Sequence, residues 1–120
     1  MLTVYTYGPC STCKKATNWL RARGIAFEKR PIRQTPPSAS ELRAMLKARG
    51  SLRPLFNTSS QDYRDLGIKD TLHTMPEADA FSLMAKNGNL VKRPFALDPA
   101  AGIFLTGFKE PEWQKAFPTP

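Results

Sequence analysis

Residues 2–20 read LTVYTYGPCSTCKKATNWL, and this stretch decides the fold of the chain. Its first part, Leu2–Tyr7, consists mainly of β-branched and aromatic residues, which predicts a strand. Gly8-Pro9 ends that strand. Apolar residues then recur at the i, i+3, i+4 spacing of a buried helical stripe, and this spacing predicts a helix over about Ser11–Arg23. The stretch is therefore a strand, a tight turn and a helix.

A second strand is predicted at Ile25–Ile32, where Pro31 suits an edge strand or a strand end. The order strand, helix, strand usually gives a parallel pair joined by a right-handed crossover. Cys10 and Cys13, the two cysteines of the chain, then lie at the carboxyl end of the first strand. Sheets of this kind place their ligands at that end.

The middle of the chain is predicted to be helical and the end to return to strands. The predicted elements are a helix opened by the Ser38-x-x-Glu41 capping box and ended by Gly50, a short helix at 61–66, a helix opened by Thr74-Met75-Pro76-Glu77 with Ala78, Phe81 and Met84 on one face, a hairpin of 95–97 and 103–105, and a last helix at 111–117. The chain thus reads as βαβ, a helical insert, and ββα.

Length and composition fit one globular domain with 120 residues and 41% hydrophobic content. The net charge of +8 suits an anionic partner, but a solvated basic surface explains it equally well. The basic residues are spread out, so we expect no direct nucleic-acid binding. The N-terminus does not resemble a signal peptide, and no apolar run could span a membrane, so a cytoplasmic location is the default expectation.

The Cys10-Ser11-Thr12-Cys13 motif carries the chemistry that the sequence predicts. Cys10 lies where the free amides and the dipole of the following helix stabilise a thiolate, and Lys14 and Lys15 add positive charge. Cys13 lies on the helix, within reach of a mixed disulfide on Cys10. We therefore predict that Cys10 is the nucleophile and Cys13 the resolving thiol of a redox-active centre that forms a disulfide bond.

Other roles for the two cysteines are less favoured. A structural zinc site needs about four ligands, whereas the chain offers two cysteines and His73. A structural disulfide across two residues closes a loop too small to gain much entropy. Two unrelated buried cysteines remain an alternative. We expect His73 at the surface or in a cap, and Trp19 and Trp113 in packing.

The assembled pattern resembles the arsenate reductase (ArsC)/Spx/YffB family of the thioredoxin-like superfamily over nearly the whole chain. The stretches that carry the resemblance are Tyr5-Thr6-Tyr7-Gly8-Pro9-Cys10-Ser11-Thr12-Cys13-Lys14-Lys15-Ala16, Phe56-Asn57-Thr58-Ser59, Tyr63-Arg64-Asp65-Leu66-Gly67, Leu90-Val91-Lys92-Arg93-Pro94 and Leu105-Thr106-Gly107-Phe108-Lys109. The resemblance implies an α/β thioredoxin-like fold in a single domain, 1–120. Its four-stranded mixed sheet would carry a helical subdomain, at about 36–88, between strands two and three. It also implies a cis Arg93-Pro94 peptide beside the cysteines.

The resemblance further implies an oxyanion site around Cys10, held in the arsenate reductases by three arginines. Arg93 and Arg53 match two of them, and Lys109 stands near the place of the third. We add Lys14, Ser11 and Thr12 as predicted oxyanion or substrate contacts and expect no metal. The arsenate reductases carry a serine where this chain has Cys13.

Two functions follow from the resemblance. One is a thiol-disulfide reductase acting on a small thiol or oxyanion, either arsenate reductase-like or glutathione-dependent like YffB. It would have no bound cofactor, and glutathione with glutaredoxin, or thioredoxin, would donate its electrons. The other is an Spx-like redox-switched transcriptional regulator that binds the RNA polymerase α subunit, in which Gly50 matches a contact position. A scaffold whose cysteines have lost activity is a third possibility.

Overall fold

A computed structural model describes residues 1–118, so the last two residues of the predicted domain lie outside the described part. The sheet has the order β2-β1-β3-β4. β1 pairs parallel with β2 and antiparallel with β3, and β3 forms a hairpin with β4. The strands are β1 Leu2–Thr6, β2 Phe27–Pro31, β3 Phe95–Asp98 and β4 Ile103–Thr106. This is the predicted four-stranded mixed sheet, with β2 and its Pro31 at an edge.

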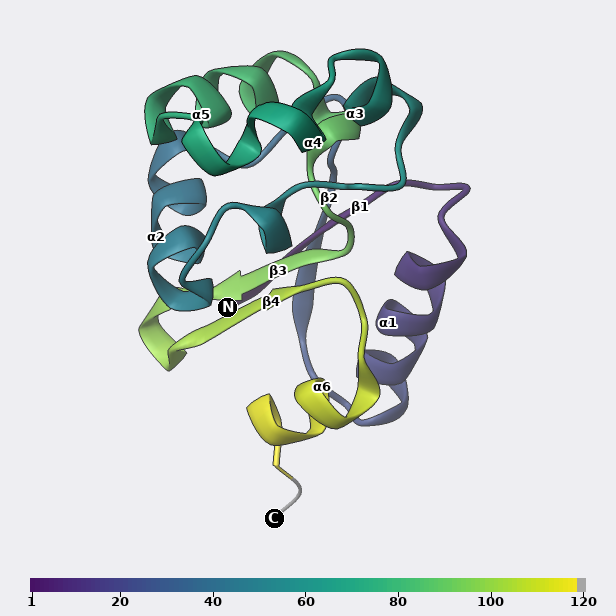
Figure 1. The fold of residues 1–120 in the computed structure, drawn as a ribbon. Helices are drawn as coiled ribbons and strands as arrows, with labels where there is room; N and C mark the ends of the chain where they lie inside the picture. The colour runs from purple at the N-terminus through teal and green to yellow at the C-terminus, as the bar shows by residue number, and fades with distance from the viewer. Residues whose placement is uncertain (119–120) are drawn as a thin grey trace.

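Helices cover both faces of the sheet (Figure 1). One face packs on α1 (Ser11–Ala22) and α6 (Glu110–Ala116), and the other on the helices between β2 and β3. Side chains alternate along β1, so Leu2 and Val4 join the cluster around α1 and α6, whereas Tyr5 joins the cluster of the insert. A strand covered on both faces is buried at nearly every position, as β1 is.

The insert consists of α2 Ala39–Arg49, α3 Gln61–Asp65, α4 Ile68–Thr71 and α5 Glu77–Lys86, with 3₁₀ turns at Arg53–Leu55, Leu72–Thr74 and Gly88–Leu90. The predicted capping box opens α2, since the Ser38 hydroxyl accepts from the Glu41 amide and the Glu41 carboxylate accepts from the Ser38 amide. Gly50 ends α2 in the left-handed conformation, with φ at 86°. The sequence did not predict α4.

The start and buried face of α5 differ from the prediction. Pro76 is the residue before the helix, and the Thr74 hydroxyl does not cap it but donates to the Thr71 carbonyl. Ala78 is exposed and Ala80 is buried instead, beside Phe81. The helix therefore begins two residues later than a cap at Thr74 requires.

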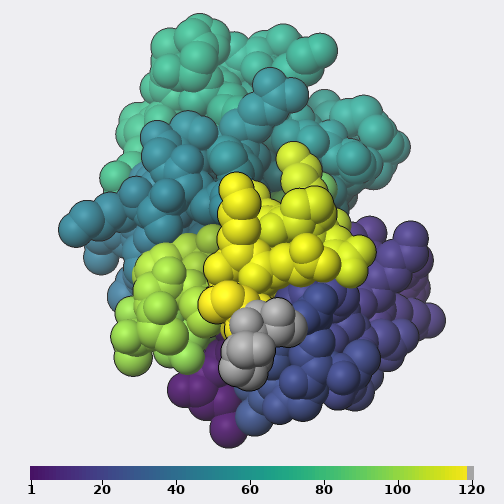
Figure 2. All heavy atoms as spheres, turned by 90° about the horizontal axis from the view of Figure 1, so that it is seen from below, coloured from purple at the N-terminus to yellow at the C-terminus, as the bar shows by residue number. Residues whose placement is uncertain are grey.

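The C-terminal helix closes one end of the molecule. Seen from below, it lies across the centre between α1 and α2 (Figure 2). Trp113 is fully buried, and its indole N–H donates to the Gly107 carbonyl at 3.1 Å. Trp19, Phe108 and Phe117 pack around it, which confirms that both tryptophans serve packing. Within residues 1–118, no helix combines the length and the apolar character that crossing a membrane requires.

Candidate active site

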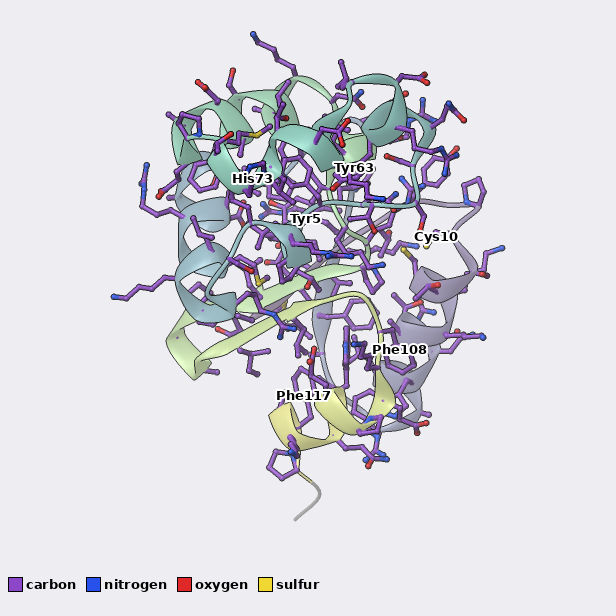
Figure 3. The ribbon with its side chains drawn as sticks, viewed as in Figure 1. Tyr5, Cys10, Tyr63, His73, Phe108 and Phe117 are labelled. Carbon is purple, nitrogen blue, oxygen red and sulfur yellow. The ribbon has the colours of Figure 1, made fainter. Side chains whose placement is uncertain are left out.

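Cys10 is the residue that caps the N-terminus of α1 (Figure 3). Its Sγ accepts a hydrogen bond from the Cys13 amide at 3.2 Å, and its own amide donates to the Tyr7 carbonyl at 3.0 Å. The first turn of this 12-residue helix contains no acidic residue. Negative charge on Sγ is therefore stabilised by an amide and by the helix dipole. Cys10 is half-buried, so a substrate can approach it.

Cys13 lies one turn further along the helix and is 2% exposed. Both thiols are free. Burial, together with the hydrogen bond and charge of Cys10, raises the pKa of Cys13 from 9.0 to about 12. A backbone hydrogen bond with Tyr7 and the charge of Arg93 act in the opposite direction. The pair is thus asymmetric: an accessible thiol stands at the helix start, and a protonated thiol lies buried beside it.

Arg93 stands directly before Pro94, and the peptide between them is cis, as predicted. Its guanidinium carbon lies 4.5 Å from the centroid of the Tyr7 ring. The Nη1 atom of Arg93 is buried and has no hydrogen-bond partner within residues 1–118. A buried donor without an acceptor is costly, so such a group is a natural receptor for an anion.

Arg53 lines a cavity of about 300 Å³ that neither cysteine lines. The other residues of this cavity are Arg49, Pro54, Phe56, Thr58, Lys92, Thr106, Lys109 and Glu112. Glu112 pairs with Arg49 at 3.2 Å. Within the described chain, no carboxylate lies within 4.0 Å of Arg53, Lys92 or Lys109. Arg53 and Lys109 thus line the same basic cavity. A direct contact of Arg53 with a substrate at the Cys10 thiol stays a prediction.

Residues 5–116 match the family model described as "ArsC family". The chain belongs to the ArsC family. It is 40% identical over 116 residues to the uncharacterized protein YusI of Bacillus subtilis, covering 95% of this chain and 96% of YusI. It is 31% identical over 119 residues to the global transcriptional regulator Spx of Enterococcus faecalis, covering 98% of this chain and 87% of Spx. Among solved structures, a possible arsenate reductase from Streptococcus mutans superposes with a TM-score of 0.83 at 39% identity, covering 91% of this chain and 92% of that one.

The remaining predicted contacts of this ArsC family chain surround the first turn of α1. Lys14 is exposed and lines a second cavity, of about 240 Å³, together with Cys13, Tyr7, Arg21 and Lys29. Thr6, Gly8, Thr17 and Asn18 complete its lining. Ser11 is exposed and Thr12 half-buried on the same turn, but they line neither of these two cavities. Their contact with a substrate stays a prediction.

Sequence reasoning missed Tyr7, Arg49 and Lys92. Tyr7 ends the predicted strand segment just before Gly8-Pro9, and this position is a signal that could have singled it out. Arg49 and Lys92 are far apart in the sequence and come together only when the chain folds. His73 is exposed, as expected. Among residues 1–118, no three His, Cys, Asp or Glu side chains are grouped so that they could hold a metal ion.

Proposed function

We propose that the chain is a thiol-disulfide oxidoreductase of the reducing cytoplasm, with Cys10 as the nucleophile and Cys13 as the resolving thiol. One observation carries this proposal: the Cys10 Sγ accepts the Cys13 amide at the N-terminus of α1, while the Cys13 thiol is buried beside it. The amide stabilises the attacking thiolate, and burial keeps the second thiol protonated until it is needed.

The reaction has two thiol exchanges and one reduction. The Cys10 thiolate attacks one sulfur of a substrate disulfide, forms a mixed disulfide, and releases the other sulfur as a thiolate. Cys13 then loses its proton and attacks the Cys10 Sγ, which forms the Cys10–Cys13 disulfide and releases the second thiolate. Two electrons from an external dithiol, or from two glutathione molecules, restore both cysteines.

Glutathione with glutaredoxin, or thioredoxin, is the proposed electron donor. Glutathione carries carboxylates, and the basic cavity of Arg53, Lys92 and Lys109 provides uncompensated positive charge for such groups. Arsenate is a second proposed oxidant. Cys10 would replace one hydroxyl of arsenate, and attack of a second thiol on Sγ would leave the S–As electron pair on arsenic and release arsenite.

A coupled assay tests the proposal. NADPH oxidation is followed with glutathione reductase, glutaredoxin and glutathione, or with thioredoxin reductase and thioredoxin, using a glutathione mixed disulfide or arsenate as substrate. We expect turnover by the wild type above the background of the donor system alone and no such excess with Cys10→Ser. When the substrate disulfide is added without any donor thiol, Cys13→Ser should keep a trapped mixed disulfide on Cys10. Absence of turnover with every pair of donor and substrate would reject the enzyme.

A regulator remains the second candidate, because the chain is 31% identical to the Enterococcus Spx over 98% of its length. Gly50, the predicted polymerase contact, is exposed at the end of α2. The regulator would bind the RNA polymerase α subunit with an affinity that depends on the state of the two cysteines. Binding of purified α subunit to reduced and oxidised chain, with Gly50→Arg as the control, distinguishes it from the enzyme.

A further inference from the structure

The guanidinium groups of two arginines lie over the Tyr7 ring. The guanidinium carbon of Arg93 lies 4.5 Å from the ring centroid, and that of Arg33 lies 5.2 Å from it. Arg33 also donates from Nη1 to the Tyr7 hydroxyl at 3.1 Å. A cation over an aromatic ring is attracted by the ring's electron-rich face, so the ring fixes the position of both groups.

The backbone of Tyr7 contacts the cysteines at the same time. Its carbonyl accepts from the Cys10 amide at 3.0 Å, and a hydrogen bond with its backbone acts on the Cys13 thiol. Tyr7 also lines the cavity that reaches Cys13. One residue therefore touches the nucleophile, the resolving thiol and the arginine beside them.

The two arginines differ in what compensates their charge. Arg33 lies near Asp62 and helps to lower the pKa of that carboxyl, although hydrogen bonds from Asn87 and Asn89 contribute more. Arg93 has no carboxylate within 4.0 Å in the described chain, and its buried Nη1 has no acceptor there. The Tyr7 ring is the aromatic group that holds this uncompensated cation.

We propose that Tyr7 is a positioning residue, whose ring holds the Arg93 guanidinium beside the cysteines as the receptor for a negatively charged group on the substrate. This inference rests on the proposed function and on the predicted oxyanion role of Arg93, and what it adds is the role of Tyr7 in holding that guanidinium in place. Tyr7 acts through Arg93 and does not react itself.

Alkylation of Cys10 by a charged and a neutral probe tests this role without any turnover. In each reaction the thiolate attacks the methylene carbon, an S–C bond forms and iodide leaves. We compare iodoacetate with iodoacetamide in the Cys13→Ser background, so that only Cys10 reacts. The measured quantity is the ratio of the two rate constants, because a general loss of structure or of thiolate changes both rates alike.

Tyr7→Leu should lower the ratio of the iodoacetate to the iodoacetamide rate constant about fivefold to tenfold. Tyr7→Phe keeps the ring and should therefore leave this ratio close to its value with Tyr7. Arg93→Gln should lower the ratio at least as far, and adding Tyr7→Leu to it should have no further effect. Tyr7→Met provides the same test if Tyr7→Leu does not fold. Lys86→Gln, which removes an exposed charge at the end of α5, away from both cysteines, is the matched control.

An unchanged ratio in Tyr7→Leu, an unchanged ratio in Arg93→Gln, or additive effects of the two substitutions would each overturn the proposal. The coupled assay is independent of this result. If the ratio responds as expected but no substrate is turned over, the anion receptor is real and the oxidoreductase proposal fails alone. If turnover occurs and the ratio does not respond, the role of Tyr7 fails alone.

Discussion

In the proposed reaction, the Cys13 thiol must lose its proton before it can release a substrate from Cys10, and the surroundings of Cys13 oppose that loss. Burial is the largest cause of a pKa of about 12, against 9.0 for the unperturbed thiol. A shift of this size lowers the thiolate fraction at neutral pH about 1000-fold. The more basic thiolate is also the better nucleophile, which recovers about 20-fold. Resolution at neutral pH should therefore be at most about 50-fold slower than for an ordinary thiol, since part of this shift comes from Cys10 itself.

The pH dependence of the resolution step is a more decisive test of this reasoning than its absolute rate. Once Cys10 is part of a mixed disulfide, its thiolate no longer raises the pKa of Cys13, whereas burial and the opposing charge of Arg93 remain. The pKa in that intermediate should lie between 9.0 and about 12. The rate of resolution should then rise about tenfold per pH unit from neutral pH to about pH 8 and should still be rising at about pH 9.

A stopped-flow experiment with an aromatic disulfide that releases a coloured thiolate measures both steps. The first equivalent of colour reports attack by Cys10, and the second reports attack by Cys13 on the mixed disulfide. Cys13→Ser should retain the first phase and lose the second. A second phase that is already independent of pH near neutrality would refute the reasoning, because it would require a Cys13 thiolate stabilised in its buried position.

Three further predictions concern stability. Gly88→Ala should destabilise the fold by roughly 3 kcal/mol or more in urea unfolding, because its Cβ would overlap the Ile32 carbonyl oxygen, whereas Gly8→Ala, which meets nothing within 4 Å, should be nearly neutral. Trp113→Phe should cost about 2–3 kcal/mol through lost packing and a lost hydrogen bond to Gly107; a cost near zero would contradict its place in the core. The raised pKa of Cys13 means that its neutral form stabilises the fold fully below pH 9 and that this stability is lost towards pH 12. Between about pH 8 and about pH 10.5, the wild type should thus lose about 2 kcal/mol more than Cys13→Ser, and equal losses would contradict the burial of the thiol.

Local signals predicted most of the fold, and the start of α5 shows where they fail. Thr74-Met75-Pro76-Glu77 contains a capping pattern, but such a pattern fits several starts. In the structure the residue before the helix is Pro76, with φ at −62° and ψ at 145°. Thr74 instead belongs to the preceding 3₁₀ turn, where its hydroxyl donates to Thr71. Tertiary packing of the insert decides between these starts, and one sequence does not report that packing.

The features of the candidate site also fall into two groups: those that local sequence predicts and those that depend on contacts between distant parts of the chain. Cys10 and Cys13 were predictable because their chemistry depends on a turn and a helix start that adjoin them in the sequence. The contact of Arg93 with Tyr7 joins two strand ends far apart in the chain. The basic cavity brings together Arg49 at the end of α2, Arg53 in the next turn, and Lys92 before β3. The hydrophobic periodicity of a sequence does not show which polar side chains come into contact when they are far apart in the chain.

Arg93 also bears on the choice between an enzyme and a regulator. A dithiol that works only as an internal switch forms and breaks one bond between Cys10 and Cys13 and needs no receptor for an external anion. A buried guanidinium nitrogen without an acceptor costs about 1–3 kcal/mol, and the described chain offers Nη1 no partner. Under the proposed function, an anionic substrate group bound beside the thiol would supply the acceptor and recover that cost. The unpartnered nitrogen therefore favours a site that receives a charged substrate over one that only reports the redox state.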